Sequence, residues 1–136
     1  MTSVLFVEDE LDMRLYISTI LRAHGYNAVS ARDGKEGLAL AAAYRPDVIL
    51  LDVMMPESGG VFMYGRLKAD PALNAIPVCI ITGVAEPSFR HFLKMTHVNP
   101  NEALPEPDAY LEKPFEPVDL VDILRRLAPG RVNGER

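Results

Sequence analysis

The sequence predicts an α/β protein built on one open, doubly wound parallel sheet of five strands. Five short apolar runs alternate with segments whose apolar residues recur at helical spacing, and this order implies parallel strands joined by right-handed crossovers. The central run, residues 48–51, is apolar without alternation, as in a strand that is covered on both faces. The chain has 136 residues, enough for one hydrophobic core. Five βα units are too few to close a βα barrel.

The first half of the chain supplies three of the expected strands, at residues 4–7, 27–31 and 48–51. A helix is expected over residues 10–23, because leucine and isoleucine recur there at helical spacing and Gly25 provides a stop. Asp33 is a typical N-cap for a second helix over residues 34–44, and Pro46 follows the end of that helix.

The second half is expected to contain strands at residues 77–82 and 109–111 and helices at residues 61–68, 88–95 and 118–127. Residues 97–108 contain three prolines, which favours an irregular loop. We therefore predict one domain over residues 1–128, followed by a flexible tail over residues 129–136.

The composition excludes several classes of protein. With 14 Lys and Arg against 19 Asp and Glu, the chain has a formal charge of −5 and lacks the basic face typical of direct nucleic-acid binding. No apolar stretch reaches the roughly 20 residues that span a membrane, and no signal peptide is evident. The single cysteine, Cys79, cannot form an internal disulfide, which indicates a reducing, cytoplasmic compartment.

Functional side chains follow four of the expected strands. Glu8 and Asp9 follow the first, Asp52 the third, Thr82 ends the fourth, and Lys113 follows the fifth. Ligands of open α/β sheets bind beyond the carboxyl ends of the strands, so these side chains are expected to converge there. Singly, each also fits an ordinary role as a helix cap, turn residue, strand residue or solvated charge. Three neighbouring carboxylates repel one another, however, and Mg²⁺ with its oxygen ligands would relieve that repulsion.

This set of side chains favours phosphoryl transfer. A carboxylate such as Asp52 can attack phosphorus and form an aspartyl-phosphate. The transition state spreads negative charge over three oxygens, which Mg²⁺, the Thr82 hydroxyl and the Lys113 ammonium would stabilise. No histidine is expected beside a nucleophile, so the pattern does not support Ser–His or Cys–His catalysis.

The same residues belong to motifs that resemble the receiver domain (CheY-like) of bacterial two-component response regulators. The motifs are residues 4–10 (VLFVEDE), 46–56 (PDVILLDVMMP), Gly60, 80–83 (IITG) and 110–115 (YLEKPF). The resemblance extends from residue 4 to about residue 127, and it implies that the loop at about residues 97–108 is enlarged. It implies a flavodoxin/CheY-like (βα)5 fold and phosphorylation by a histidine kinase or a histidine phosphotransfer protein. Output would then pass through protein–protein contacts, with an unknown downstream protein or a phosphorylation-dependent homodimer.

The resemblance assigns metal and phosphoacceptor roles to four positions. Asp52 matches the phosphoacceptor aspartate. Asp9 matches the residue that binds Mg²⁺ directly, and Glu8 its neighbour that acts through water. The backbone carbonyl of Met54 would be a further ligand of the ion.

It also assigns the switch residues. Thr82 matches the switch hydroxyl, Lys113 the lysine that contacts the phosphate, and Tyr110 the switch aromatic, while the Lys113–Pro114 peptide is commonly cis in the family. The positions that tune loss of the phosphoryl group are occupied by Met54 and Val84, whose side chains do not hydrogen-bond an attacking water. A long-lived aspartyl-phosphate is therefore expected.

Other functions stay open from the sequence alone. The chain is expected to catalyse only its own phosphorylation and slow dephosphorylation, whether as a stand-alone receiver or as a fragment of a longer DNA-binding regulator or hybrid histidine kinase. A metal-dependent phosphatase of the haloacid dehalogenase type would need an aspartate at the position of Met54. A flavodoxin-like cofactor carrier would need a phosphate-binding loop where residues 8–10 are all acidic.

Overall fold

The structure is a computed structural model that describes residues 2–53, 60–95, 97–99 and 102–129. The strands are β1 (Ser3–Val7), β2 (Asn27–Ala31), β3 (Val48–Asp52), β4 (Val78–Thr82), β5 (His97–Asn99), β6 (Glu102–Ala103) and β7 (Ala109–Glu112). The helices are α1 (Leu11–Ala23), α2 (Gly34–Tyr44), α3 (Gly60–Ala69), α4 (Glu86–Met95) and α5 (Pro117–Leu127). Every element expected from the sequence is present, and its ends differ from the expected ends by no more than two residues.

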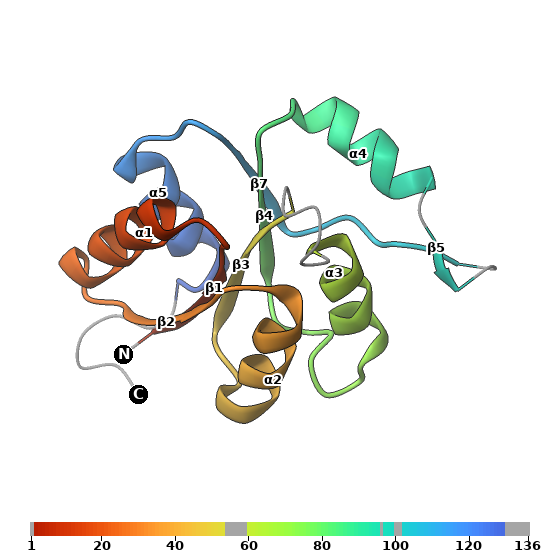
Figure 1. The fold of residues 1–136 in the computed structure, drawn as a ribbon, viewed down its shortest axis with the longest axis horizontal. Helices are drawn as coiled ribbons and strands as arrows, with labels where there is room; N and C mark the ends of the chain where they lie inside the picture. Colours follow the sequence, from red (N-terminus) through yellow and green to blue (C-terminus); the bar gives the residue numbers. More distant parts are fainter. Residues whose placement is uncertain (1, 54–59, 96, 100–101, 130–136) are drawn as a thin grey trace.

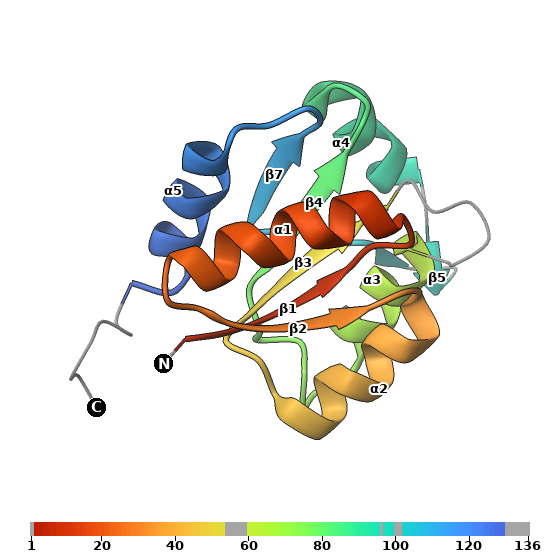
Figure 2. The same cartoon turned by 60° about the vertical axis from the view of Figure 1, so that its left-hand side comes forward.

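The main sheet has five parallel strands in the order β2-β1-β3-β4-β7, the doubly wound arrangement that the sequence predicts (Figure 1). Helices α1 and α5 pack on one face of the sheet, while α2, α3 and α4 pack on the other (Figure 2). Each face has its own apolar core, and every residue of β3 between them is buried. Cys79 is buried in β4 among apolar side chains.

Local signals in the sequence set the helix ends. The Asp33 carboxylate accepts a hydrogen bond from the backbone N–H of Glu36 at 2.8 Å, which caps α2 as predicted. Gly25 follows α1 with a φ of 84°, a left-handed conformation that glycine adopts without steric cost. Among the described helices, none is long and apolar enough to cross a membrane.

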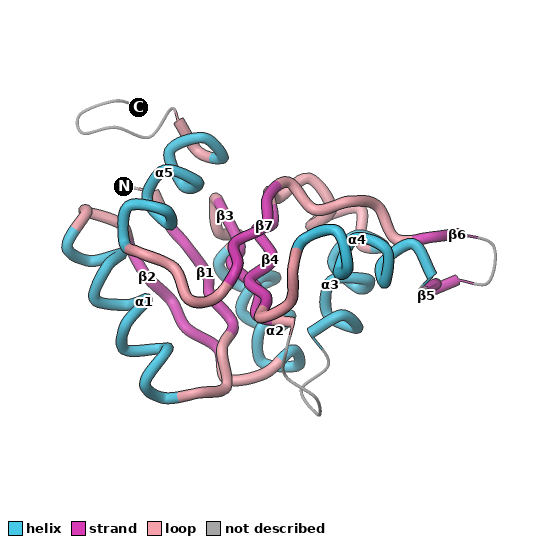
Figure 3. The backbone as a smooth tube through the Cα atoms, turned by 90° about the horizontal axis from the view of Figure 1, so that it is seen from above, coloured by secondary structure: helices cyan, strands magenta, loops and turns pink. Residues whose placement is uncertain are grey.

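The expectation that residues 97–108 are irregular was wrong for two short stretches. β5 and β6 pair with each other in a small antiparallel sheet, beside α3 and α4 (Figure 3). Pro105 and Pro107 follow β6 in the sequence, so they do not interrupt the pairing. The predicted tail over residues 129–136 lies almost wholly outside the described residues.

Candidate functional site

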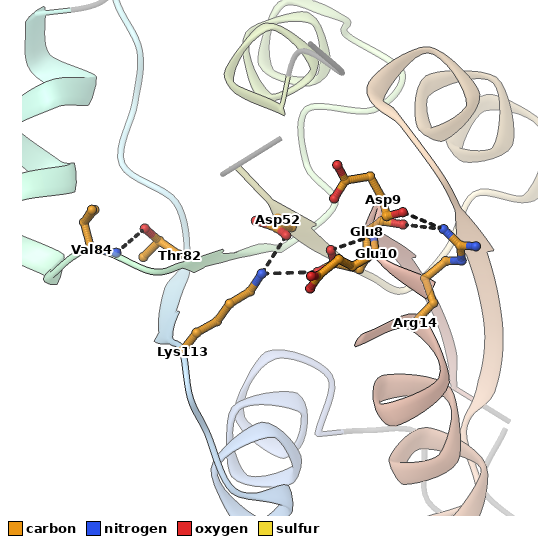
Figure 4. Close-up of polar contacts among 8 residues, drawn as sticks. All are labelled: Glu8, Asp9, Glu10, Arg14, Asp52, Thr82, Val84 and Lys113. Atoms are coloured by element: carbon orange, nitrogen blue, oxygen red, sulfur yellow. Dashed lines mark hydrogen bonds and ion pairs between the residues drawn. The ribbon is translucent and has the colours of Figure 1, made fainter. Parts of the chain in front are cut away.

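The candidate site lies where the carboxyl ends of four neighbouring strands meet. Glu8 and Asp9 come directly after β1, Asp52 ends β3, Thr82 ends β4, and Lys113 follows β7 (Figure 4). These four strands are consecutive in the sheet and run parallel, so their ends lie at the same edge. The topology therefore brings together residues that are separated by up to 105 positions in the sequence.

The Lys113 ammonium lies between two buried carboxylates. Its Nζ is 2.8 Å from Asp52 Oδ2 and 3.4 Å from Glu8 Oε1. The backbone N–H of Lys113 donates to the Thr82 carbonyl at 2.8 Å, and the Lys113–Pro114 peptide is cis, as in the family that the sequence resembles. Burial alone lowers the pKa of Lys113, but the hydrogen bond to Asp52 and the two negative charges outweigh burial and raise that pKa. The ammonium is therefore held firmly in its charged form.

Glu8 is the most strongly perturbed acid of the site. Its side chain is only 1% exposed, and its Oε2 accepts a hydrogen bond from the backbone N–H of Glu10 at 3.1 Å. Burial, reinforced by the hydrogen bond to Asp52, raises the pKa of Glu8 to about 8. In the absence of a metal ion, the site therefore retains a proton near neutral pH.

This raised pKa predicts a pH-dependent difference in stability between the wild type and Glu8→Gln. The carboxyl titrates near 4.5 when unfolded and near 8 when folded, so its protonated form stabilises the protein fully below pH 4.5. This stabilisation is lost progressively as the pH rises from about 4.5 and is gone above about 8, with a slope of up to about 1.4 kcal/mol per pH unit between these values. The glutamine of Glu8→Gln carries no charge at any pH. In the presence of a chelator, the melting temperature of this variant should therefore match that of the wild type near pH 4.5 and exceed it above pH 8.

A matched control is Glu10→Gln, because the Glu10 side chain is exposed. Parallel pH curves for wild type and Glu8→Gln would contradict the prediction.

The carboxylates of Glu8, Asp9 and Asp52 form a cluster that fits a hard divalent cation. One oxygen from each lies within 4.8 Å of the others, and Asp9 is exposed while Glu8 and Asp52 are buried. Carboxylate oxygens with one side open to water suit Mg²⁺, which retains several waters when it binds. The carbonyl of Met54, expected to be a further ligand, lies outside the described residues.

Two further residues, Arg14 and Gly60, shape the backbone that carries this cluster. Arg14 Nη1 donates to the backbone carbonyls of Glu8 and Asp9, at 3.1 and 3.2 Å, and so fixes the chain that carries both acids. At Gly60, a Cβ would lie 2.8 Å from the Asp52 carbonyl oxygen, so only glycine lets α3 begin against the end of β3. Gly60 belonged to the expected motif, whereas no local signal marks Arg14.

Thr82 and Tyr110, which are expected from the sequence to act as the switch, lie beside the cluster rather than within it. Thr82 is fully buried, and its hydroxyl accepts a hydrogen bond from the backbone N–H of Val84 at 3.1 Å. Tyr110 pairs with Ile80, two residues before Thr82, so Tyr110 and Thr82 lie on the same face of the sheet. Instead of contacting the acids, the Tyr110 ring packs edge-on against Phe89 of α4, with ring centroids 6.1 Å apart.

Comparison with protein families identifies this arrangement. Residues 4–125 match the model of the response regulator receiver domain. The chain is 43% identical over 84 residues to the polar-differentiation response regulator DivK of Brucella anthropi, an alignment that covers 61% of this chain and 68% of DivK. It is 32% identical over 132 residues to the phosphate regulon transcriptional regulatory protein PhoB of Pseudomonas aeruginosa, covering 94% of this chain. It spans only about half of PhoB, 54% of that protein's length.

Solved structures agree with the sequence relatives. The chemotaxis protein CheY4 of Vibrio cholerae superposes with a TM-score of 0.79 at 31% identity, over 93% of this chain and 98% of CheY4. The receiver domain of sensor histidine kinase PA1611 from Pseudomonas aeruginosa, solved with a magnesium ion in its active-site cleft, has a TM-score of 0.76 at 27% identity. That match covers 93% of this chain and 96% of the PA1611 domain. With the matched family model and the doubly wound fold, these likenesses show that the chain belongs to the response regulator receiver domains, the phosphoacceptor signalling modules of two-component systems.

Proposed function

We propose that Asp52 accepts a phosphoryl group in a Mg²⁺-dependent reaction and that the chain acts as a phosphorylation switch. The observation that carries this proposal is the pairing of a buried carboxylate with an ammonium: Asp52 Oδ2 lies 2.8 Å from Lys113 Nζ, at the open edge of the sheet. The phosphodonor would be the phosphohistidine of a histidine kinase or of a histidine phosphotransfer protein. In this proposal, the chain turns over no metabolite and catalyses only its own phosphorylation and slow dephosphorylation.

The chemistry needs few groups beyond those already in place. An Asp52 carboxylate oxygen forms a bond to phosphorus while the P–N bond of the phosphohistidine breaks, and the leaving imidazole takes up a proton. The Lys113 ammonium stabilises the negative charge of the phosphoryl oxygens, and the Thr82 hydroxyl donates to one of them after leaving its contact with Val84. Glu8, Asp9 and Asp52 would hold Mg²⁺, which supplies charge neutralisation during the transfer.

A small phosphodonor tests this proposal directly. Incubation of the protein with acetyl phosphate and Mg²⁺ should add one phosphoryl group, visible by intact-protein mass spectrometry, and a chelator should prevent the addition. Peptide mapping after reduction with borohydride should place the label on Asp52. A protein that stays unmodified at saturating Mg²⁺ would refute the proposed reaction.

The phosphoryl group is expected to persist, because Val84 and Met54 offer no side chain that orients an attacking water. Introducing Met54→Asn and Val84→Glu together should shorten the half-life on the order of tenfold or more, since both new side chains hydrogen-bond water. The measurement is loss of the phosphorylated mass after removal of the phosphodonor. A wild-type half-life of seconds, or an unchanged half-life in the double variant, would contradict the expectation.

The output is proposed to pass through protein–protein contacts, to a downstream protein or to a second copy of this chain. A further candidate is a receiver within a longer DNA-binding regulator. The observation that favours it is that the chain aligns with only about half of the transcriptional regulator PhoB. Size-exclusion chromatography before and after phosphorylation distinguishes dimer formation from signalling through a monomer.

A further inference from the structure

The segment over residues 102–108 docks on two helices of the receiver. The Tyr64 hydroxyl of α3 donates to the Pro105 carbonyl at 2.7 Å, and Tyr64 is fully buried. Leu104 is buried in the same apolar core as Phe89 and Leu93 of α4. These contacts tie the segment to α3 and to α4 at once.

A charged pair links the same segment to α4. Arg90 Nε lies 2.8 Å from Glu106 Oε1, while the Arg90 guanidinium also pairs with Glu86, one helical turn away on α4. All three side chains are about half exposed, so each pair is individually weak. These pairs matter because they position Arg90 over the ring of Tyr110.

The guanidinium of Arg90 lies over the ring of Tyr110, with its Cζ 5.3 Å from the ring centroid. The Tyr110 hydroxyl is buried, and the side chain that interacts with it is that of Arg90. The Tyr110 side chain is therefore held by Phe89 and Arg90, its two neighbours on α4. A change in the position of the ring therefore displaces Arg90, and displacing Arg90 strains its pair with Glu106.

We propose that Arg90 and Glu106 couple the position of Tyr110 to the docking of residues 102–108, so that phosphorylation of Asp52 loosens this segment. The inference rests on the proposed function, because it takes movement of Thr82 towards the phosphoryl group as the event that moves Tyr110. Coupling of this kind is reciprocal: weakening the Glu106 contact lowers the cost of moving the ring. The docking of residues 102–108 on α3 and α4 thus depends on whether Asp52 is phosphorylated.

Hydrogen exchange of residues 102–108, with beryllofluoride and Mg²⁺ as the mimic of the aspartyl-phosphate, tests the coupling. In the wild type, the mimic should raise exchange of this segment several-fold. Glu106→Gln should exchange fast already without the mimic, show little further change, and bind beryllofluoride about two- to fivefold more tightly. The matched control is Glu86→Gln, which removes the other partner of Arg90 and should respond to the mimic as the wild type does.

Two readouts separate this inference from the function on which it rests. A bound ¹⁹F signal that disappears in Asp52→Asn reports that the mimic occupies the site. If that signal is present and exchange of residues 102–108 is unchanged in the wild type, or if Glu106→Gln responds like the wild type, the coupling is overturned and the receiver function stands. If the bound ¹⁹F signal is absent in the wild type, both the coupling and the proposed receiver function are overturned. Arg90→Lys keeps the charge but loses the planar contact with the ring, so it should weaken the response as Glu106→Gln does.

Discussion

Replacing Asp52 with asparagine is expected to abolish phosphorylation by acetyl phosphate while leaving the protein folded. Asparagine retains the size of the side chain but is not a nucleophile towards phosphorus at neutral pH. In this variant, the hydrogen bond and the negative charge of Asp52 no longer raise the pKa of Glu8, so Glu8 ionises more readily and supplies a counter-charge 3.4 Å from the Lys113 ammonium. The expected result is no added phosphoryl mass at any time, with a melting temperature close to that of the wild type.

The control for this experiment is Asp12→Asn, because Asp12 is an exposed aspartate at the start of α1 and lies outside the acidic cluster. It should be phosphorylated at the wild-type rate. The label on the wild type should also be released by hydroxylamine, which cleaves acyl phosphates and spares phosphate esters. A hydroxylamine-resistant label, or equal labelling of Asp52→Asn, would place the phosphoryl group on another residue.

Removing the ammonium of Lys113 is expected to slow phosphorylation by roughly 10²-fold, the usual cost of losing one donor to a developing oxyanion. In Lys113→Ala, the carboxylates of Glu8 and Asp52 lose the only cationic side chain placed between them by the described contacts. Without the Lys113 ammonium, no positive side chain between these carboxylates repels a divalent cation. Mg²⁺ should therefore bind at least as tightly as in the wild type. The rate should therefore fall even at saturating Mg²⁺.

Two measurements keep the two effects of Lys113→Ala apart. Isothermal titration calorimetry reports Mg²⁺ affinity, and the initial rate of labelling at saturating Mg²⁺ reports the transfer step. The exposed Lys35 of α2 supplies the control, since Lys35→Ala should change neither quantity. Weakened Mg²⁺ binding with an unchanged saturated rate would assign Lys113 a role in metal binding instead of in phosphoryl transfer.

Much of the fold could be predicted because its signals are local. Asp33 caps α2 and Gly25 follows α1 in a left-handed conformation, and both effects need only neighbouring backbone atoms. The apolar run of β3 indicated a central strand because burial on both faces requires apolar side chains on both. The site was also predictable in outline, since parallel strands place the residues after their ends at one edge of the sheet.

The short strands β5 and β6 could not be predicted from local sequence signals. A pairing of so few residues has little propensity of its own and depends on contacts with α3 and α4. The prolines of this region indicated an interruption, but they could not show that the Pro105 carbonyl would meet the Tyr64 hydroxyl.

By itself, the sequence determined the order of the strands and helices, the caps, and which acids, hydroxyl and amine reach the open edge of the sheet. Only the tertiary structure decided that Glu8 is buried enough to raise its pKa, that Arg14 fixes the backbone beneath the acids, and that Arg90 joins Glu106 to Tyr110. The physical reason is distance. Desolvation, ion pairing and ring packing depend on atoms that are brought together only when remote segments fold, whereas helix periodicity and capping depend on residues a few positions apart.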